Sequence, residues 1–112
     1  IVLGTNHADM ALAVNRVFAL EGGQVAVRDG EVLEEVAYPV LGLLSDCSAE
    51  ELAEKKKALT GAIAGLGCKI GMPFMFLSFL SLAAGGGYAI TDHGLIDSAH
   101  QCVADPVIRI VE

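Results

Sequence analysis

The chain has 112 residues, which fits one domain over 1–112, and 54% of them are hydrophobic. Its mean hydropathy is +0.57, so a domain of this size cannot bury every apolar side chain, and we expect some of them to face a partner. The net charge is −7. This acidic balance argues against binding to nucleic acid or to an anionic membrane surface, because both require clustered lysine and arginine.

The first expected element is a short buried strand over Ile1 to Gly4. Natural chains rarely begin inside a strand, and no initiator methionine precedes this one, so we expect an excised C-terminal fragment of a longer protein. Asn6 can cap a following helix, and Asp9 suits the positive end of that helix. Apolar residues then recur at helical spacing until Gly22, at Met10, Val14, Val17 and Phe18.

A β-hairpin is expected after the first helix. Asp29 and Gly30 tolerate the positive φ angles of a tight two-residue turn, and they separate two strand-like segments, 24–28 and 31–37. The next segment, 38–44, is apolar and contains a proline, and we expect it to be extended.

The second helix is expected to begin after Ser48, with Glu51 completing a capping box. Gly67 suits the end of this helix, and four apolar residues are expected on its buried face: Leu52, Leu59, Ile63 and Leu66. Three consecutive lysines, 55–57, stand near glutamates in this helix and are expected to lie on a solvated face.

The stretch PFMFLSFLSL, residues 73–82, is apolar at eight of its ten positions. It is shorter than the ~20 residues that a membrane-spanning helix needs, so no membrane span is expected. The absence of β-branched residues weakens a strand, and Pro73 suits the first position of a helix. Both alternatives stay open, and we favour an extended core segment that is buried on both faces.

Two more elements complete the expected fold. The residues Thr91 to Gly94 predict a turn, and Val107 to Val111 predict a final strand. The resulting order, β-α-β-β-α-β, indicates an α+β fold in which two helices pack on a mixed, largely antiparallel β-sheet.

Few polar residues could carry chemistry. His7 and Asp9 form a weak metal pair, because a catalytic metal needs three or four converging ligands. Three cysteines match no zinc or redox motif and are expected to be reduced thiols: Cys47, Cys68 and Cys102. A loose cluster is interpreted as a turn and exposed surface: Asp92, His93, Asp97 and His100. The residues alone indicate no complete active site.

Four stretches carry a recognisable pattern in one order along nearly the whole chain. They are VLGTNHADMALAVNRV at 2–17, PVLGLLSD at 39–46, PFMFLSFLSL at 73–82 and ITDHGLID at 90–97. They resemble the C-terminal domain of adenine deaminases, whose pattern includes GTN and DMA, PIAGLMSD, PFMTLSFLAL and ITDxGLVD. Two departures are Phe76 in place of threonine and the glycine-rich residues 83–88 in place of a proline-containing apolar stretch.

The resemblance implies a cytoplasmic, oligomeric enzyme of the amidohydrolase superfamily that hydrolyses adenine to hypoxanthine and ammonia in purine salvage. A divalent metal, manganese or iron, would activate water in a (β/α)8 barrel through ligands that include a His-x-His pair. This chain has three histidines and no His-x-His. We therefore expect no cofactor in it, no activity of the isolated chain, and its own catalytic barrel domain as partner.

Seven residues are the candidates for an interdomain surface or a pocket: Asn6, His7, Asp9, Ser45, Phe74, Met75 and Phe79. The three in PFMFLSFLSL are expected to be packing anchors against the barrel or another subunit. An alternative is a stand-alone module that binds a small ligand, such as a purine, near Asn6, His7 and Ser45. A further alternative is a purely structural oligomerisation domain of the same enzyme.

Overall fold

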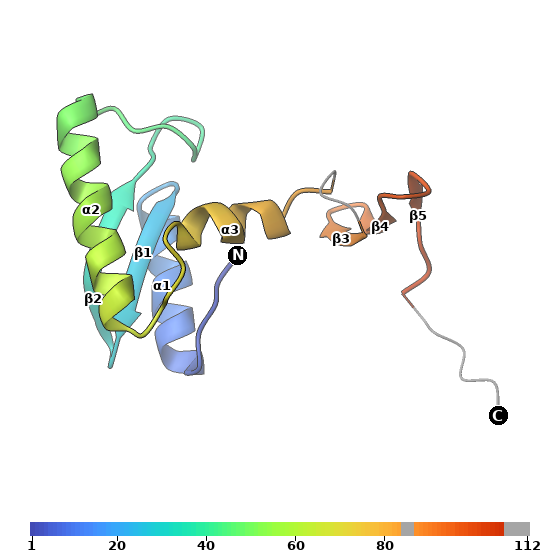
Figure 1. Ribbon diagram of the computed structural model, residues 1–112. Helices are drawn as coiled ribbons and strands as arrows, with labels where there is room; N and C mark the ends of the chain where they lie inside the picture. Colours follow the sequence, from blue (N-terminus) through green and yellow to red (C-terminus); the bar gives the residue numbers. More distant parts are fainter. Residues whose placement is uncertain (84–86, 107–112) are drawn as a thin grey trace. The chain divides into compact units, whose positions relative to one another are not determined.

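The computed structural model describes residues 1–83 and 87–106 of the chain. The chain divides into two units, which we treat separately. The N-terminal unit contains residues 2–73, and the C-terminal unit contains Ile1 with the described residues from Phe74 onward. Figure 1 labels the elements of both units.

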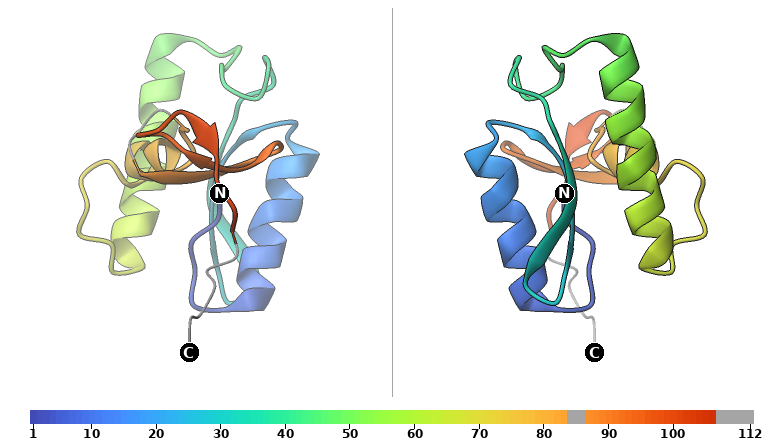
Figure 2. Two further views of the ribbon diagram at one scale, coloured as in Figure 1. Left: turned by 90° about the vertical axis from the view of Figure 1, so that its right-hand side faces the viewer. Right: turned by 90° about the vertical axis from the view of Figure 1, so that its left-hand side faces the viewer.

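The N-terminal unit is built from two helices and one hairpin. Its elements are α1 (His7–Ala19), β1 (Gly23–Arg28), β2 (Glu31–Ala37) and α2 (Ala49–Gly65). The helix α1 packs mainly against β1, and α2 packs mainly against β2. Figure 2 shows the two helices on either side of the hairpin. Three apolar side chains of this layer are fully buried, namely Ala26, Val36 and Leu59.

Both helices begin at the caps expected from the sequence. The Asn6 side chain accepts a hydrogen bond from the N–H of Ala8 at 2.9 Å, and the Ser48 hydroxyl accepts one from the N–H of Glu51 at 3.2 Å. Each bond satisfies a backbone donor that has no partner within its own helix. The predicted starts of α1 and α2 are therefore confirmed.

The hairpin turn is also confirmed. Asp29 and Gly30 have φ angles of 53° and 81°, both in the left-handed region that a tight hairpin turn requires. The two strands pair antiparallel from Gly23–Ala37 to Arg28–Glu31, with one register irregularity between Ala26 and Val27.

The predicted strand at residues 1–4 is wrong, because these residues adopt no regular structure. A strand is stable only where a neighbouring strand takes up its backbone N–H and C=O groups. The segment pairs with no strand among residues 1–83 and 87–106. Its apolar sequence was therefore insufficient to form a strand.

The segment 73–82 is helical over most of its length, so the extended conformation that we favoured is wrong. Helix α3 spans Pro73–Leu80 and begins with proline at its first position. Methionine and leucine lose less side-chain freedom in a helix than β-branched residues do. No residue of α3 is fully buried, and no helix among the described residues is long and apolar enough to span a membrane.

The C-terminal unit contains a second small sheet. Strands β3 (Tyr88–Thr91), β4 (Gly94–Asp97) and β5 (Cys102–Val103) pair antiparallel in that order. The predicted turn before Gly94 connects β3 to β4. The predicted strand Val107–Val111 lies outside the described residues.

The α+β class is confirmed. Within residues 1–83 and 87–106 the structure has three helices instead of two, and two separate antiparallel sheets instead of one mixed sheet. The central order of helix, hairpin and helix matches the prediction. Among the described strands, β1 and β2 pair with each other, and β3, β4 and β5 form a second sheet.

Candidate functional site

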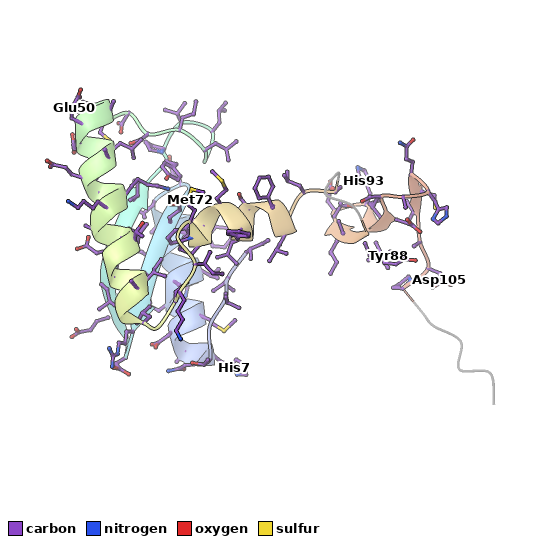
Figure 3. All side chains as sticks on the ribbon, viewed as in Figure 1. His7, Glu50, Met72, Tyr88, His93 and Asp105 are labelled. Carbon is purple, nitrogen blue, oxygen red and sulfur yellow. The ribbon has the colours of Figure 1, made fainter. Side chains whose placement is uncertain are left out.

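Three of the candidate residues, Asn6, His7 and Asp9, lie at the start of α1, and the carboxylate of Asp9 is bound to the hairpin turn. Asp9 Oδ2 accepts the N–H of Asp29 at 3.0 Å, and Asp9 Oδ1 accepts the N–H of Gly30 at 2.8 Å. The carboxylate therefore fastens α1 to the turn of the hairpin. His7 is exposed and points away from the unit at the lower end of α1 in Figure 3.

Ser45 lies in the connection between β2 and α2. Its hydroxyl oxygen is 3.0 Å from the sulfur of Cys47. This connection and the start of α1 lie at opposite ends of the N-terminal unit (Figures 1 and 2). The structure therefore does not bring Ser45 together with Asn6 and His7.

A bidentate ion pair connects α1 to β2. Arg16 Nε and Nη2 donate to the two carboxylate oxygens of Glu35, each at 2.6 Å. The hydrogen bond and the charge of Arg16 lower the pKa of the Glu35 carboxyl. An open depression beside the pair is lined by both residues together with Val32, Leu33 and Glu34. Arg16 and Glu35 are paired with each other, so the lining of this depression offers a ligand no unpaired positive charge.

The lysine run in α2 is only partly the solvated face that we expected. Lys55 pairs with Glu51 at 2.7 Å, one helical turn away. Lys56 is half-buried and donates to Gln24 Oε1 at 2.7 Å and to the hydroxyl of Tyr38 at 3.3 Å. The sequence analysis missed this contact between α2 and the hairpin, because the alternation of charges around Lys56 is typical of a surface.

The candidate residues of α3 form an apolar surface. Met75 is 50% exposed and Phe79 is 58% exposed, while Phe74 is half-buried. Phe76 and Leu80, which we did not select, are exposed to a similar or greater extent. The helix has no charged residue and one serine, Ser78, so it presents mainly large apolar side chains.

In the C-terminal unit, the cluster that we interpreted as a turn and surface contains a close contact between the Asp97 carboxylate and the His100 ring. Asp97 is almost fully buried, and its carboxylate accepts the N–H groups of Ala99 and His100 at 3.0 and 3.2 Å. The Nδ1 atom of His100 is 2.7 Å from Asp97 Oδ2. This hydrogen bond is the main reason that the pKa of Asp97 is lowered.

The other histidine of the cluster closes the hairpin turn between β3 and β4. The N–H of His93 donates to the hydroxyl of Thr91 at 3.2 Å, and the His93 side chain is exposed. Figure 3 labels His93 in this turn. The bonds of Asp97 and Thr91 are those of local turns, so the cluster as a whole does not have the geometry of a catalytic site.

The side chains of the described residues do not fit a catalytic divalent metal. Within 1–83 and 87–106, no three His, Cys, Asp or Glu side chains converge closely enough to hold an ion. His7 belongs to one unit, and His93 and His100 belong to the other. A catalytic metal needs at least three protein ligands and an open position.

The family comparison and the similar proteins agree with each other. The family model described as adenine deaminase C-terminal domain matches residues 1–102. The chain is 44% identical over 110 residues to adenine deaminase 1 of Desulfotalea psychrophila, which covers 98% of this chain and 18% of that protein. It is 45% identical over 109 residues to adenine deaminase 1 of Carboxydothermus hydrogenoformans, covering 96% and 18%. The chain therefore spans about 18% of the length of these relatives.

Proposed function

Since this chain belongs to the family of adenine deaminase C-terminal domains, we propose that it is part of a longer adenine deaminase. That longer protein is called the parent below. The parent would hydrolyse adenine to hypoxanthine and ammonia, and this chain would be a structural domain that contacts the catalytic part. The observation that carries the proposal is the family match over residues 1–102.

The chemistry of the described residues supports a structural role. The best-ordered polar groups are occupied within the chain. Asp9 binds the hairpin turn, Arg16 binds Glu35, and Asp97 binds its own turn and His100. These interactions hold elements together, and none presents a nucleophile, base or metal ligand set to a substrate. The residues for water activation and adenine recognition would lie in the rest of the parent.

The parent's other properties belong to the same proposal. Its catalytic part would be a (β/α)8 barrel with a divalent metal, manganese or iron, and that metal would supply Lewis-acid activation of water for the deamination. This chain would supply no ligand to that metal. We further propose that the parent is a cytoplasmic homo-oligomer in purine salvage and that residues 1–112 act as one domain in it.

The contact with the catalytic part would include the apolar surface of α3. Its anchors would be Phe74, Met75 and Phe79, which the described part of the C-terminal unit leaves half-buried or exposed. Covering such side chains stabilises an association by roughly 25 cal/mol per Å² of apolar area.

The test is ammonia release from adenine by the metal-loaded parent, measured with and without residues 1–112, with the isolated chain as control. We expect activity only in the complete parent. If the truncated parent were as active as the complete one, the domain would be dispensable and the structural role would be refuted. If neither form released ammonia from adenine, the proposed substrate would be wrong.

A further inference from the structure

Residues 39–44, which we call the leucine loop, expose large apolar side chains at one end of the N-terminal unit. Leu41 is 88% exposed, Leu43 is 77% exposed and Leu44 is 60% exposed. The loop follows β2 and lies at the end of the unit opposite the start of α1 (Figure 1). A small soluble domain can expose single apolar residues, but a contiguous apolar group indicates a surface for a partner.

The leucine loop is ordered by its own backbone, and it is not extended as the sequence analysis expected. The N–H of Val40 donates to the carbonyl of Leu44 at 3.1 Å, and the carbonyl of Val40 accepts the N–H groups of Leu43 and Leu44 at 3.1 Å each. Val40 and Leu44 thus form an isolated antiparallel bridge. A preformed loop binds a partner at a lower entropic cost than a disordered one.

The base of the loop is packed against the end of α1. A Cβ atom on Gly22 would lie 2.4 Å from the Cα of Gly42, so only glycine allows this close approach. Phe18, in the last turn of α1, is 79% exposed. Its carbonyl accepts the N–H of Glu21, the residue before Gly22. The backbone that follows α1 is therefore fixed against the base of the leucine loop, at Gly22 and Gly42.

The backbone of Leu41 is unfavourable for the isolated unit. Its φ angle is 56°, in the left-handed region where glycine, asparagine or aspartate is expected. The leucine side chain is almost fully exposed, so burial within the unit does not offset the backbone cost. Strain of this kind is typical of sites that bind a partner.

We propose that the leucine loop docks onto an apolar recess in the catalytic part of the parent. This inference rests on the proposed function, because it takes the partner to be the rest of the same polypeptide. The matched relatives are about 18% covered by this chain, so most of such a polypeptide is available as the partner. Charged partners are disfavoured, because the loop itself carries no charged residue.

A second copy of the chain is a weaker candidate than a covalently linked partner. Stable interfaces between separate proteins bury about 1,600 Å² in total, and the three exposed leucines of the loop supply only a part of that area. Within one polypeptide the effective concentration is high, so a small apolar contact suffices. The size of the loop therefore fits an intramolecular docking surface.

The first test is hydroxyl-radical footprinting of Leu41 and Leu43 by mass spectrometry, in the parent and in the isolated 112-residue chain, with a dosimeter peptide in both samples. We expect oxidation of both leucines to be at least fivefold slower in the parent. Equal rates would overturn the proposal. Slow oxidation in the isolated chain would also overturn the proposal. If that protection increased with protein concentration, a second copy of the chain would cover the leucine loop. If it did not, another part of the same chain would cover it.

The second test uses the variant Leu41→Asp/Leu43→Asp and the control Leu33→Asp, which alters a 39% exposed leucine of β2. The double variant is expected to leave the unfolding midpoint of the isolated chain unchanged and to lower the inactivation temperature of the parent by several degrees. The control is expected to lower both values to a similar extent, because Leu33 is only 39% exposed in the chain itself. Equal effects of the double variant in both proteins, or no effect in the parent, would refute docking.

The footprinting experiment and the deaminase assay can refute the docking surface and the proposed function separately. A parent that releases ammonia from adenine while Leu41 and Leu43 oxidise freely would refute the docking surface and leave the proposed function intact. A parent that protects both leucines but does not act on adenine would refute the proposed substrate and leave the docking surface intact.

Discussion

At the scale of single residues, α1 and α2 end in the same backbone motif, but a different residue type occupies its left-handed position in each helix. In α1 the N–H of Gly22 donates to the carbonyl of Val17, and in α2 the N–H of Cys68 donates to the carbonyl of Ile63. Both are the six-residue bonds of a Schellman motif, which requires a left-handed residue after the cap. That residue is Gly67 in α2 but Glu21 in α1, with φ angles of 96° and 60°.

We predict that Glu21→Gly raises the free energy of unfolding of the 112-residue chain by about 0.5–1 kcal/mol, because glycine adopts the left-handed conformation without steric cost. The matched variant Gly67→Ala is expected to lower the free energy of unfolding, because alanine is strained at a left-handed position. No neighbouring atom lies within 4 Å of the added Cβ, so this backbone strain is the main change. Urea unfolding followed by circular dichroism measures both. A decrease for Glu21→Gly would show that its side chain stabilises the helix end.

Asp9 binds the hairpin turn, which is distant from it in sequence. Its two oxygens accept the turn amides of the hairpin 20 and 21 residues away. We predict that Asp9→Ala lowers the free energy of unfolding by about 1–2 kcal/mol, because two backbone donors lose a charged acceptor. Urea unfolding should show this loss, and the control Glu34→Ala on the exposed surface of β2 should change stability by less than about 0.5 kcal/mol.

Amide hydrogen exchange in the hairpin turn is a second test of the hydrogen bonds that the variant Asp9→Ala removes. Faster exchange at Asp29 and Gly30, with unchanged exchange in α2, is the pattern expected from loss of this contact. If the turn amides exchanged at the same rate in Asp9→Ala as in the original chain, the hydrogen bonds would be absent in solution.

At the scale of elements, α1 is joined to the hairpin at two places, by Asp9 at the turn and by Arg16 at Glu35 on β2. The link through Glu35 depends on pH. Its ordinary pKa of 4.5 is lowered by the hydrogen bond and charge of Arg16. A carboxyl with a lowered pKa in the folded state contributes stability that is fully present above its ordinary pKa and is lost as the pH falls through the lowered value.

We therefore predict that Glu35→Gln is less stable than the original chain at pH 7 and that the difference disappears in acid, where Glu35 is protonated. The control Glu34→Gln removes the same charge from the neighbouring position and should show no such convergence. Thermal unfolding between pH 7 and pH 2.5 provides the measurement. A stability difference that stays constant with pH would mean that the ion pair contributes nothing.

At the scale of the whole molecule, the exposed apolar side chains are the main feature to explain. In the described part of the C-terminal unit, Ala89 is the buried apolar residue, whereas Met75, Phe76 and Phe79 are each at least half exposed. A unit with so small a core is marginal by itself. This composition fits a domain that is stabilised by the rest of its parent.

We predict that Phe79→Asp changes the unfolding midpoint of the isolated chain little, because the side chain is 58% exposed there. In the parent it should reduce the inactivation temperature, because a carboxylate would be buried against the catalytic part. Ser78→Asp, at the adjacent exposed position of the same helix, is the matched control. Unchanged folding and unchanged domain association in the parent would show that Phe79 is not an anchor.

The sequence by itself determined the helix caps and the hairpin turn of this protein. The caps at Asn6 and Ser48, the Asp29–Gly30 turn and the helix end at Gly67 depend on residues a few positions apart, whose conformational preferences act within one turn. The family motifs are likewise continuous stretches, so they could be recognised without a fold. Asparagine, serine, aspartate and glycine have preferences strong enough to set these boundaries.

The tertiary structure decided what each element contacts. Residues 1–4 have the composition of a strand but no strand beside them, and Pro73–Leu80 has the composition of a core segment but forms a helix with no fully buried residue. The roles of Asp9, Lys56 and the leucine loop depend on partners about 20 or more residues away. Pairing and burial are long-range properties, and hydrophobic composition alone does not specify which surfaces meet.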